Sequence, residues 1–242
     1  MTMEKTHKLV DSIRSDYLDK VIGQDIYPRI TGISTKDNPL AVVCVFFLRK
    51  ATKSLDAICS LCEAGFHEDA LVLARVIFEH GLNAQYMAAK LTLAESSNAA
   101  LSFIYDGDEQ RVTRLAHLMK LKSEGKCLSW ISEIEASNPV QAQTMQKPAN
   151  FDKKSLEKMA LDVGGEWGCW YHFLYWSVSK LTHPSGLGSH TYLEDVDVES
   201  SGALSVALTL HYALVRAMLG MLGLESSHPD LEAAVLKIIK QP

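Results

Sequence analysis

The sequence lacks the long apolar segment that a membrane-spanning helix requires. Its longest apolar run, residues 39–48, ends at Arg49 and Lys50 and falls short of the ~20 residues that cross a bilayer. Residues 1–11 are polar and charged, so they lack the apolar core of a secretory signal peptide. We therefore expect a cytoplasmic protein without a membrane partner.

Cysteine is scarce, and a large excess of one charge sign is absent. The chain carries 24 Lys and Arg against 29 Asp and Glu, a formal net charge of −5. This balance gives no global attraction for nucleic acid, so any site for a polyanion must be local. The five cysteines form an odd and scattered set, which favours reduced thiols over a disulfide framework: Cys44, Cys59, Cys62, Cys127 and Cys169.

Motifs for metals, redox chemistry and phosphate binding are also missing. Cys59 and Cys62 form a Cys-x-x-Cys pair, but no second pair follows, and the pair lies inside a predicted helix. Gly186 and Gly188 precede no Lys-Ser/Thr and follow no strand, so they do not form a phosphate loop. We therefore expect no metal site and no cofactor.

Strand-like alternation is nearly absent, whereas apolar residues recur at three- and four-residue spacing almost throughout the chain. The composition, 47% hydrophobic and 22% charged over 242 residues, is that of a globular chain with a substantial core. We predict an all-α fold, a single-domain helical bundle over residues 1–242. Its core covers about 40–223, with an N-terminal helix and loop over 1–38. The predicted helices are 4–22, 40–63, 67–90, 95–124, 127–137, 153–162, 166–183, 201–223 and 229–240.

Residues typical of helix starts and helix ends predict a central antiparallel helix hairpin. Asn38-Pro39 fits a helix start with proline in the first turn. Gly65 fits the left-handed residue that ends a helix, and Glu68 and Asp69 suit the positive end of the next one. The hairpin is formed by 40–63 and 67–90, and we expect 166–183 and 201–223 to pack on it.

One candidate site lies in the second helix of the hairpin. Arg75, Glu79, Leu82 and Tyr86 share one stripe, because each step is close to one helical turn. Apolar neighbours suggest that much of this helix is buried, so the charged pair requires partners. Two interpretations remain open: a structural Arg–Glu bridge, or a polar site lined by that pair.

A second candidate lies on the aromatic helix over 166–183. His172, Trp176, Ser179 and His183 share a stripe, and His183 stands at the helix end before Pro184, where an imidazolium is favoured. The alternative is a core aromatic helix whose last histidine caps its own carbonyls. No nucleophile-elbow sequence surrounds the serine, which disfavours a Ser–His catalytic pair.

We expect the two candidates to meet in one partly buried cluster, because unpaired charges in apolar helices are costly. A separate basic stretch over 111–126 could contact phosphates, or form a solvated helix face. It holds Arg111, Arg114, Lys120, Lys122 and Lys126 against one acid, Glu124.

Two pieces of the chain resemble a bacterial all-helical family of unknown function. In that family a helix carries an arginine and, one turn later, a glutamate, as Arg75 and Glu79 do here. A later aromatic helix ends in serine, three residues, histidine and proline, as Ser179, His183 and Pro184 do. The resemblance covers about residues 40–220.

That family in turn looks similar to the HEPN group of helical proteins. The resemblance implies a metal-independent ribonuclease of toxin–antitoxin, CRISPR or phage-defence systems that acts as a dimer. Arg75 and His80 match the arginine, four residues, histidine spacing of the HEPN motif, although Val76 stands where a polar residue is usual. Because Arg75 and His80 are ~140° apart on a regular helix, a shared site requires a dimer or a distortion. His183 is the better partner for Arg75.

Two functions follow from these features. The first is a HEPN-like ribonuclease or its inactive descendant, in which a histidine acts on the ribose 2′-hydroxyl and Arg75 stabilises phosphate charge. The second is a non-catalytic helical module that binds a small molecule or a partner protein. In either case we expect a homo-oligomer, most simply a dimer, because 42–48 and 203–222 carry apolar surface on more than one face.

Overall fold

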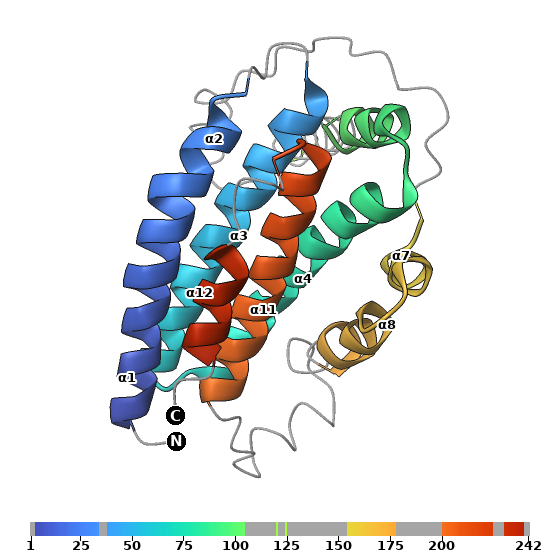
Figure 1. Cartoon of the computed structure of the whole chain (residues 1–242). Coiled ribbons are helices and arrows are strands. Elements are labelled where there is room, and N and C mark those ends of the chain that lie inside the picture. The colour runs from blue at the N-terminus through green and yellow to red at the C-terminus, as the bar shows by residue number, and fades with distance from the viewer. Residues whose placement is uncertain are drawn as a thin grey trace.

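The computed structural model describes residues 3–33, 38–104, 120, 124, 154–177, 200–224 and 230–239. Every regular element in these ranges is a helix, and no strand occurs among them. Figure 1 shows the helices side by side in a bundle. The predicted all-α class is therefore confirmed. The predicted helix over 127–137 lies outside the described residues.

The first helix is longer than predicted and its turns are wider. Three segments follow one another directly: α1 (Met3–Ser12), η1 (Ile13–Ile26) and α2 (Tyr27–Thr31), of which η1 is a π-helix. The buried residues of η1 recur about every four to five positions: Ile13, Tyr17 with Leu18, Ile22 and Ile26. This spacing exceeds the 3.6-residue period and suits the i→i+5 bonding of a π-helix.

The predicted central hairpin is confirmed in the pairing of α3 (Pro39–Glu63) with α4 (His67–Lys90). At the start of α3, the Asn38 side chain accepts a hydrogen bond from the Ala41 amide at 3.0 Å. At its end, Gly65 has φ 85°, and the Phe66 amide donates to the Leu61 carbonyl at 2.8 Å. Gly65 thus supplies the left-handed residue that closes the turn.

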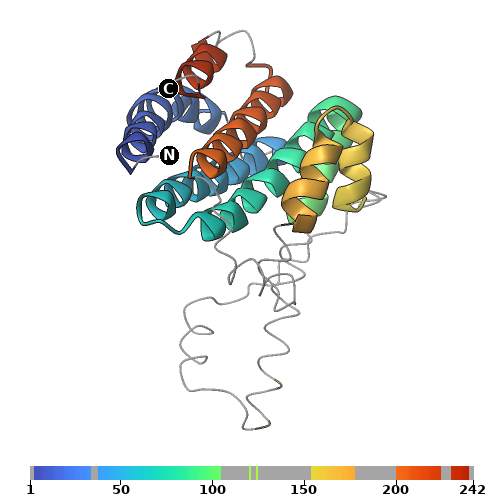
Figure 2. The same ribbon diagram turned by 90° about the horizontal axis from the view of Figure 1, so that it is seen from below.

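The remaining helices pack on both sides of this hairpin. The long helix α11 (Ser200–Met221) contacts both α3 and α4, and α12 (Asp230–Ile239) contacts α11 and η1. Figure 2 shows α7, α8 and η2 on the opposite side of α4 from α12. Their bounds are α7 Leu156–Val163, α8 Trp167–Trp170 and η2 Tyr171–Ser177, and residues 93–104 form a further helix.

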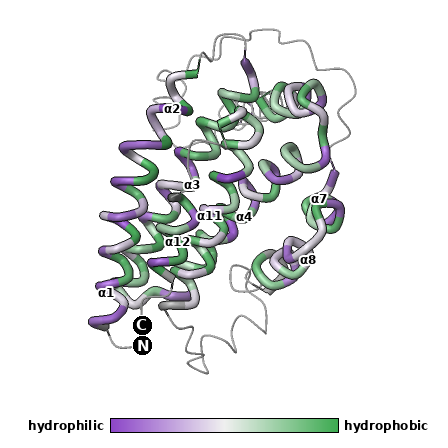
Figure 3. The backbone as a smooth tube through the Cα atoms, viewed as in Figure 1, coloured by the Kyte–Doolittle hydropathy of each residue, from purple (hydrophilic) through white to green (hydrophobic). Residues whose placement is uncertain are grey.

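The core runs through the whole bundle and includes the first helix. Val10, Ile13 and Tyr17 join one buried cluster with residues of α3, α4 and α11. Hydrophilic residues line the outer side of α1 in Figure 3, whereas α11 is largely hydrophobic. By length and apolar composition alone, residues 202–221 of α11 would suffice to cross a membrane, which corrects the expectation that no segment approaches that length. In the structure 56% of that stretch is buried inside the protein.

Candidate functional site

Arg75 and Glu79 form an ion pair on α4. The Arg75 Nε atom donates to Glu79 Oε1 at 2.9 Å across one helical turn. Both side chains are half-buried, with 23% and 35% of their surfaces exposed. The Glu79 backbone carbonyl also accepts a hydrogen bond from the Asn83 side chain at 2.6 Å. The pair predicted from i,i+4 spacing is therefore present, in surroundings between solvent and core.

The stripe continues into Tyr86, which anchors α7 against α4. Leu82 is fully buried and Tyr86 is nearly so. The Lys154 Nζ atom lies 5.2 Å from the centre of the Tyr86 ring and 2.6 Å from Asp162 Oδ2. Hydrogen bonds from the ammonium to Asp162 and Tyr86 raise the pKa of Lys154 above its ordinary value. Tyr86 thus packs between helices, with a cation over its ring.

His80 belongs to different surroundings from Arg75. Its ring stacks on Phe47 with centroids 5.1 Å apart and meets Phe46 edge-on at 5.6 Å. Burial and, secondarily, the charge of Lys50 lower the pKa of His80 to about 4, so the imidazole is neutral at pH 7. The His80 ring thus lies among aromatic side chains whereas Arg75 pairs with Glu79, and a site shared by the two residues stays a prediction.

The segment from α8 to η2 covers another side of α4. Trp167 packs on Phe78, with ring centroids 5.7 Å apart. A Cβ added to Gly81 would lie 3.2 Å from the Trp167 ring and 3.6 Å from the Leu210 carbonyl, so glycine permits this approach of the helices. His172 is exposed and lies edge-on to Tyr171 at 5.5 Å.

Of the remaining predicted site residues, one lies within the part of the chain that the structure describes and four lie outside it. Trp176 belongs to η2, whose backbone is described and which contacts α4. Four residues lie outside the described ranges: Ser179, His183, Arg111 and Arg114. The meeting of Arg75 and Glu79 with the Ser179–His183 end therefore stays a prediction.

Three of the four cysteines in the described ranges are buried, and the fourth, Cys169, is exposed. Cys44, Cys59 and Cys62 are buried, and burial raises the pKa of the thiols to about 12, 12 and 11 respectively. Protonated thiols neither bind metal nor attack disulfides. Within the described ranges no group of three or more His, Cys, Asp or Glu side chains is placed to hold a metal ion.

Sequence reasoning missed a fully buried polar group at the centre of the bundle. His211 of α11 is completely buried, and its Nδ1 atom lies 2.9 Å from the Tyr17 hydroxyl. Its Nε2 atom lies 3.1 Å from the Thr52 hydroxyl of α3. Burial lowers the pKa of His211 to about 3 and raises that of Tyr17. The available signal was a histidine inside an otherwise apolar helix.

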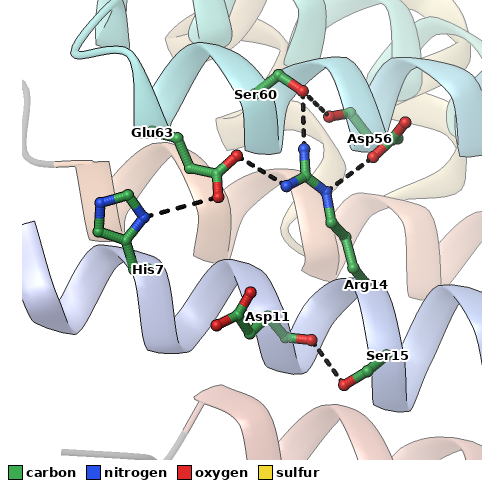
Figure 4. A network of polar contacts seen from close by, with 7 residues as sticks. All are labelled: His7, Asp11, Arg14, Ser15, Asp56, Ser60 and Glu63. Carbon is green, nitrogen blue, oxygen red and sulfur yellow. Dashed lines mark hydrogen bonds and ion pairs between the residues drawn. The ribbon is translucent and has the colours of Figure 1, made fainter.

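A second missed network binds the first helix to α3 (Figure 4). Arg14 donates to Asp56 at 3.0 Å, to Glu63 at 2.7 Å and to Ser60 at 2.7 Å. The His7 ring lies 3.7 Å from the other Glu63 oxygen. Arg14 and His7 come from the first helix and their partners from α3, so this network is a structural clamp between the two elements.

Together, the fold and the Arg75–Glu79 pair define an all-α protein with a half-buried ion pair on its central hairpin. The chain belongs to the family described as "Family of unknown function (DUF5677)", whose model matches residues 41–200. The matched range includes α4, α7, α8 and η2, and all of α3 except its first two residues. No curated protein and no solved structure gives a match.

Proposed function

We propose that this protein is a HEPN-like, metal-independent ribonuclease in which Arg75 contacts the RNA phosphate. The observation that carries the proposal is the half-buried Arg75–Glu79 pair on the central hairpin. A carboxylate one turn away fixes the guanidinium at the protein surface, where it offers charge-assisted hydrogen bonds to a phosphate oxygen. Partial burial strengthens such contacts relative to those of a fully solvated arginine.

The acid–base group in this proposal is His183 rather than His80. With its pKa near 4 and its ring among phenylalanines, His80 is poorly matched to proton transfer near neutral pH. The π-helix η2 packs against α4 and ends at Ser177, only six residues before His183. This proximity in sequence supports His183 as the partner of Arg75, and Ser179 as a hydrogen-bonding neighbour.

The test is cleavage of single-stranded RNA in the presence of a chelator. The wild-type protein is expected to cut the RNA, and His183→Ala to abolish cleavage while the melting temperature stays nearly unchanged. His7→Gln is the matched control, because it alters a histidine of α1 that lies beside Glu63 and outside the proposed site, and it should retain cleavage. Cleavage that requires Mg²⁺, or that survives His183→Ala, would contradict the proposal.

A second candidate is a non-catalytic helical module, most simply a cytoplasmic homodimer, that binds a small molecule or partner protein. The observation in its favour is that Glu79 already satisfies Arg75 Nε. In that case Arg75→Ala lowers thermal stability and alters no activity beyond the loss of folded protein. Sedimentation equilibrium tests the dimer, since the monomer mass is 26.8 kDa.

A further inference from the structure

An exposed stripe runs along the first half of α3. Val42, Phe46, Lys50 and Lys53 follow one another at four-, four- and three-residue intervals and are all exposed. Phe46 has 45% of its surface exposed, which is a large accessible area for an aromatic ring in a helix whose opposite face lies in the core. Side chains at these intervals lie on one helical face.

Other rings hold Phe46 in place. Its ring meets His80 edge-on at 5.6 Å and lies 5.7 Å from Phe103, which belongs to the helix over 93–104. Below it, the fully buried Phe47 stacks on His80 and contacts Phe103 at 5.2 Å. Phe46 is thus braced by its neighbours and still open to solvent, as a preorganised stacking surface requires.

The part of α3 that carries Phe46 is basic, although the chain as a whole is negative. Residues 39–55 contain Arg49, Lys50 and Lys53 and no acidic residue. Arg49 is turned toward the first helix, where its Nε donates to the Tyr27 hydroxyl at 2.6 Å. Lys50 and Lys53 remain as the cations of the stripe, so a ligand complementary to this face carries negative charge.

We propose that the exposed Phe46 ring, braced by His80 and Phe103, forms with Lys50 and Lys53 a binding face for single-stranded RNA, with a base stacked on Phe46 and phosphates beside the lysines. Exposed aromatics interleaved with basic residues recognise single strands in this way. The inference rests on the proposed function, for which RNA is the substrate. His80 and Arg75 are five residues apart on α4, or ~7.5 Å along its axis and ~140° around it, so a strand that reaches both residues passes around α4.

The test separates binding from cleavage by using an RNA whose 2′-hydroxyls are methylated. The probe is a fluorescein-labelled 2′-O-methyl oligo(A) 12-mer, compared by anisotropy with an abasic 12-mer of equal charge. Phe46→Ala should weaken binding of oligo(A) about 5-fold or more, since stacking contributes ~1 kcal/mol or more per base. Phe46→Tyr should restore the binding of oligo(A). The abasic strand should bind weakly to the wild type and to Phe46→Ala alike.

Matched controls distinguish this face from a general surface effect. Phe66, 56% exposed in the turn between α3 and α4, is the control ring, and Phe66→Ala should leave binding unchanged. Lys50→Ala should reduce the slope of log K against log salt by about 0.7. Lys5→Ala makes the same change in net charge on α1 and should leave that slope as it is.

The outcomes also separate this inference from the ribonuclease. Binding that depends on Phe46, without cleavage of unmodified RNA, supports the face and defeats the ribonuclease. Cleavage by the wild type together with unaltered binding by Phe46→Ala overturns the face alone. If oligo(A) does not bind, the inference is wrong. If Phe46→Ala changes only the sedimentation mass, the inference is also wrong and the stripe is an interface between copies of the chain.

Discussion

The Arg75–Glu79 pair and the Tyr17–His211–Thr52 group show two ways in which this bundle accommodates polar side chains. The ion pair joins residues four apart on one helix, and its members are half-exposed. The histidine group joins three helices, spans up to 194 positions of sequence, and has a fully buried imidazole at its centre. The first depends on local helix geometry, whereas the second depends on how the whole bundle assembles.

Because of this difference, we expect the removal of one side chain to change the free energy of unfolding by unequal amounts in the two groups. A half-exposed pair that loses one member can replace it with water, so little free energy is at stake. A buried group that loses its centre leaves polar atoms without a hydrogen bond, as well as a cavity. The predictions below test that contrast in order of decreasing effect.

The largest effect is expected from His211→Ala. It should lower the free energy of unfolding by roughly 3 kcal/mol or more, because it leaves a cavity and an unpaired Tyr17 hydroxyl. Urea denaturation followed by circular dichroism measures the loss. Tyr17→Phe, which removes only one hydroxyl, should cost about 1–3 kcal/mol. Equal stability of His211→Ala and wild type would contradict the buried geometry.

The second prediction concerns pH. The pKa of His211 is depressed in the folded state to about 3, against 6.5 ordinarily, so the unfolded chain takes up the proton first. Stability is therefore fully present above pH 6.5 and falls as the pH drops toward 3, by up to about 1.4 kcal/mol per pH unit from this group. His211→Gln should flatten the stability profile between pH 6.5 and 4. His80, with a pKa near 4, contributes in the same direction.

How far the sequence predicts the structure follows the same division between local and long-range contacts. The hairpin, its Asn38 cap, its Gly65 turn and the Arg75–Glu79 pair were all predicted, because each depends on residues within one or two turns. The partners of His211 were not predicted, because no spacing rule relates position 211 to positions 17 and 52.

The first helix is an intermediate case. In the sequence, the spacing of Ile13, Tyr17, Ile22 and Ile26 at four, five and four residues indicates turns wider than those of an α-helix. The prediction assumed a 3.6-residue period and stopped at residue 22, whereas the helix runs to Thr31. Gly23 lies inside the helix, and Ile26 and Ile30 beyond it are fully buried in the core.

Arg14 provides a further test of the contrast between local and long-range polar groups. Its hydrogen bonds join residues far apart in the sequence, but they are partly exposed to solvent. Arg14→Ala should lower the free energy of unfolding by about 1–2 kcal/mol, since three acceptors on α3 lose their donor but remain accessible to water. Thermal denaturation measures the effect. Arg14→Lys should recover only part of the loss, because an ammonium does not reproduce the planar set of donors. A loss as large as that of His211→Ala would show that sequence separation, not burial, determines the cost.

The smallest effect on stability is expected at the candidate site itself. Arg75→Ala should cost no more than about 1 kcal/mol, and a double-mutant cycle with Glu79→Ala should give a coupling energy of about 0.5 kcal/mol.

A catalytic role of the pair predicts unequal effects on cleavage and on stability. Arg75→Ala then reduces RNA cleavage far more than it reduces the folded fraction, and Arg75→Lys restores part of the rate. Glu79→Gln is the matched control, because it keeps the shape of the carboxylate but removes the charge that orients the guanidinium. If Arg75→Ala and Glu79→Gln change the melting temperature and any cleavage in equal proportion, the pair stabilises the hairpin and nothing more. A coupling energy of several kcal/mol would instead mean that the pair is as strongly desolvated as His211, and the contrast between the two polar groups would disappear.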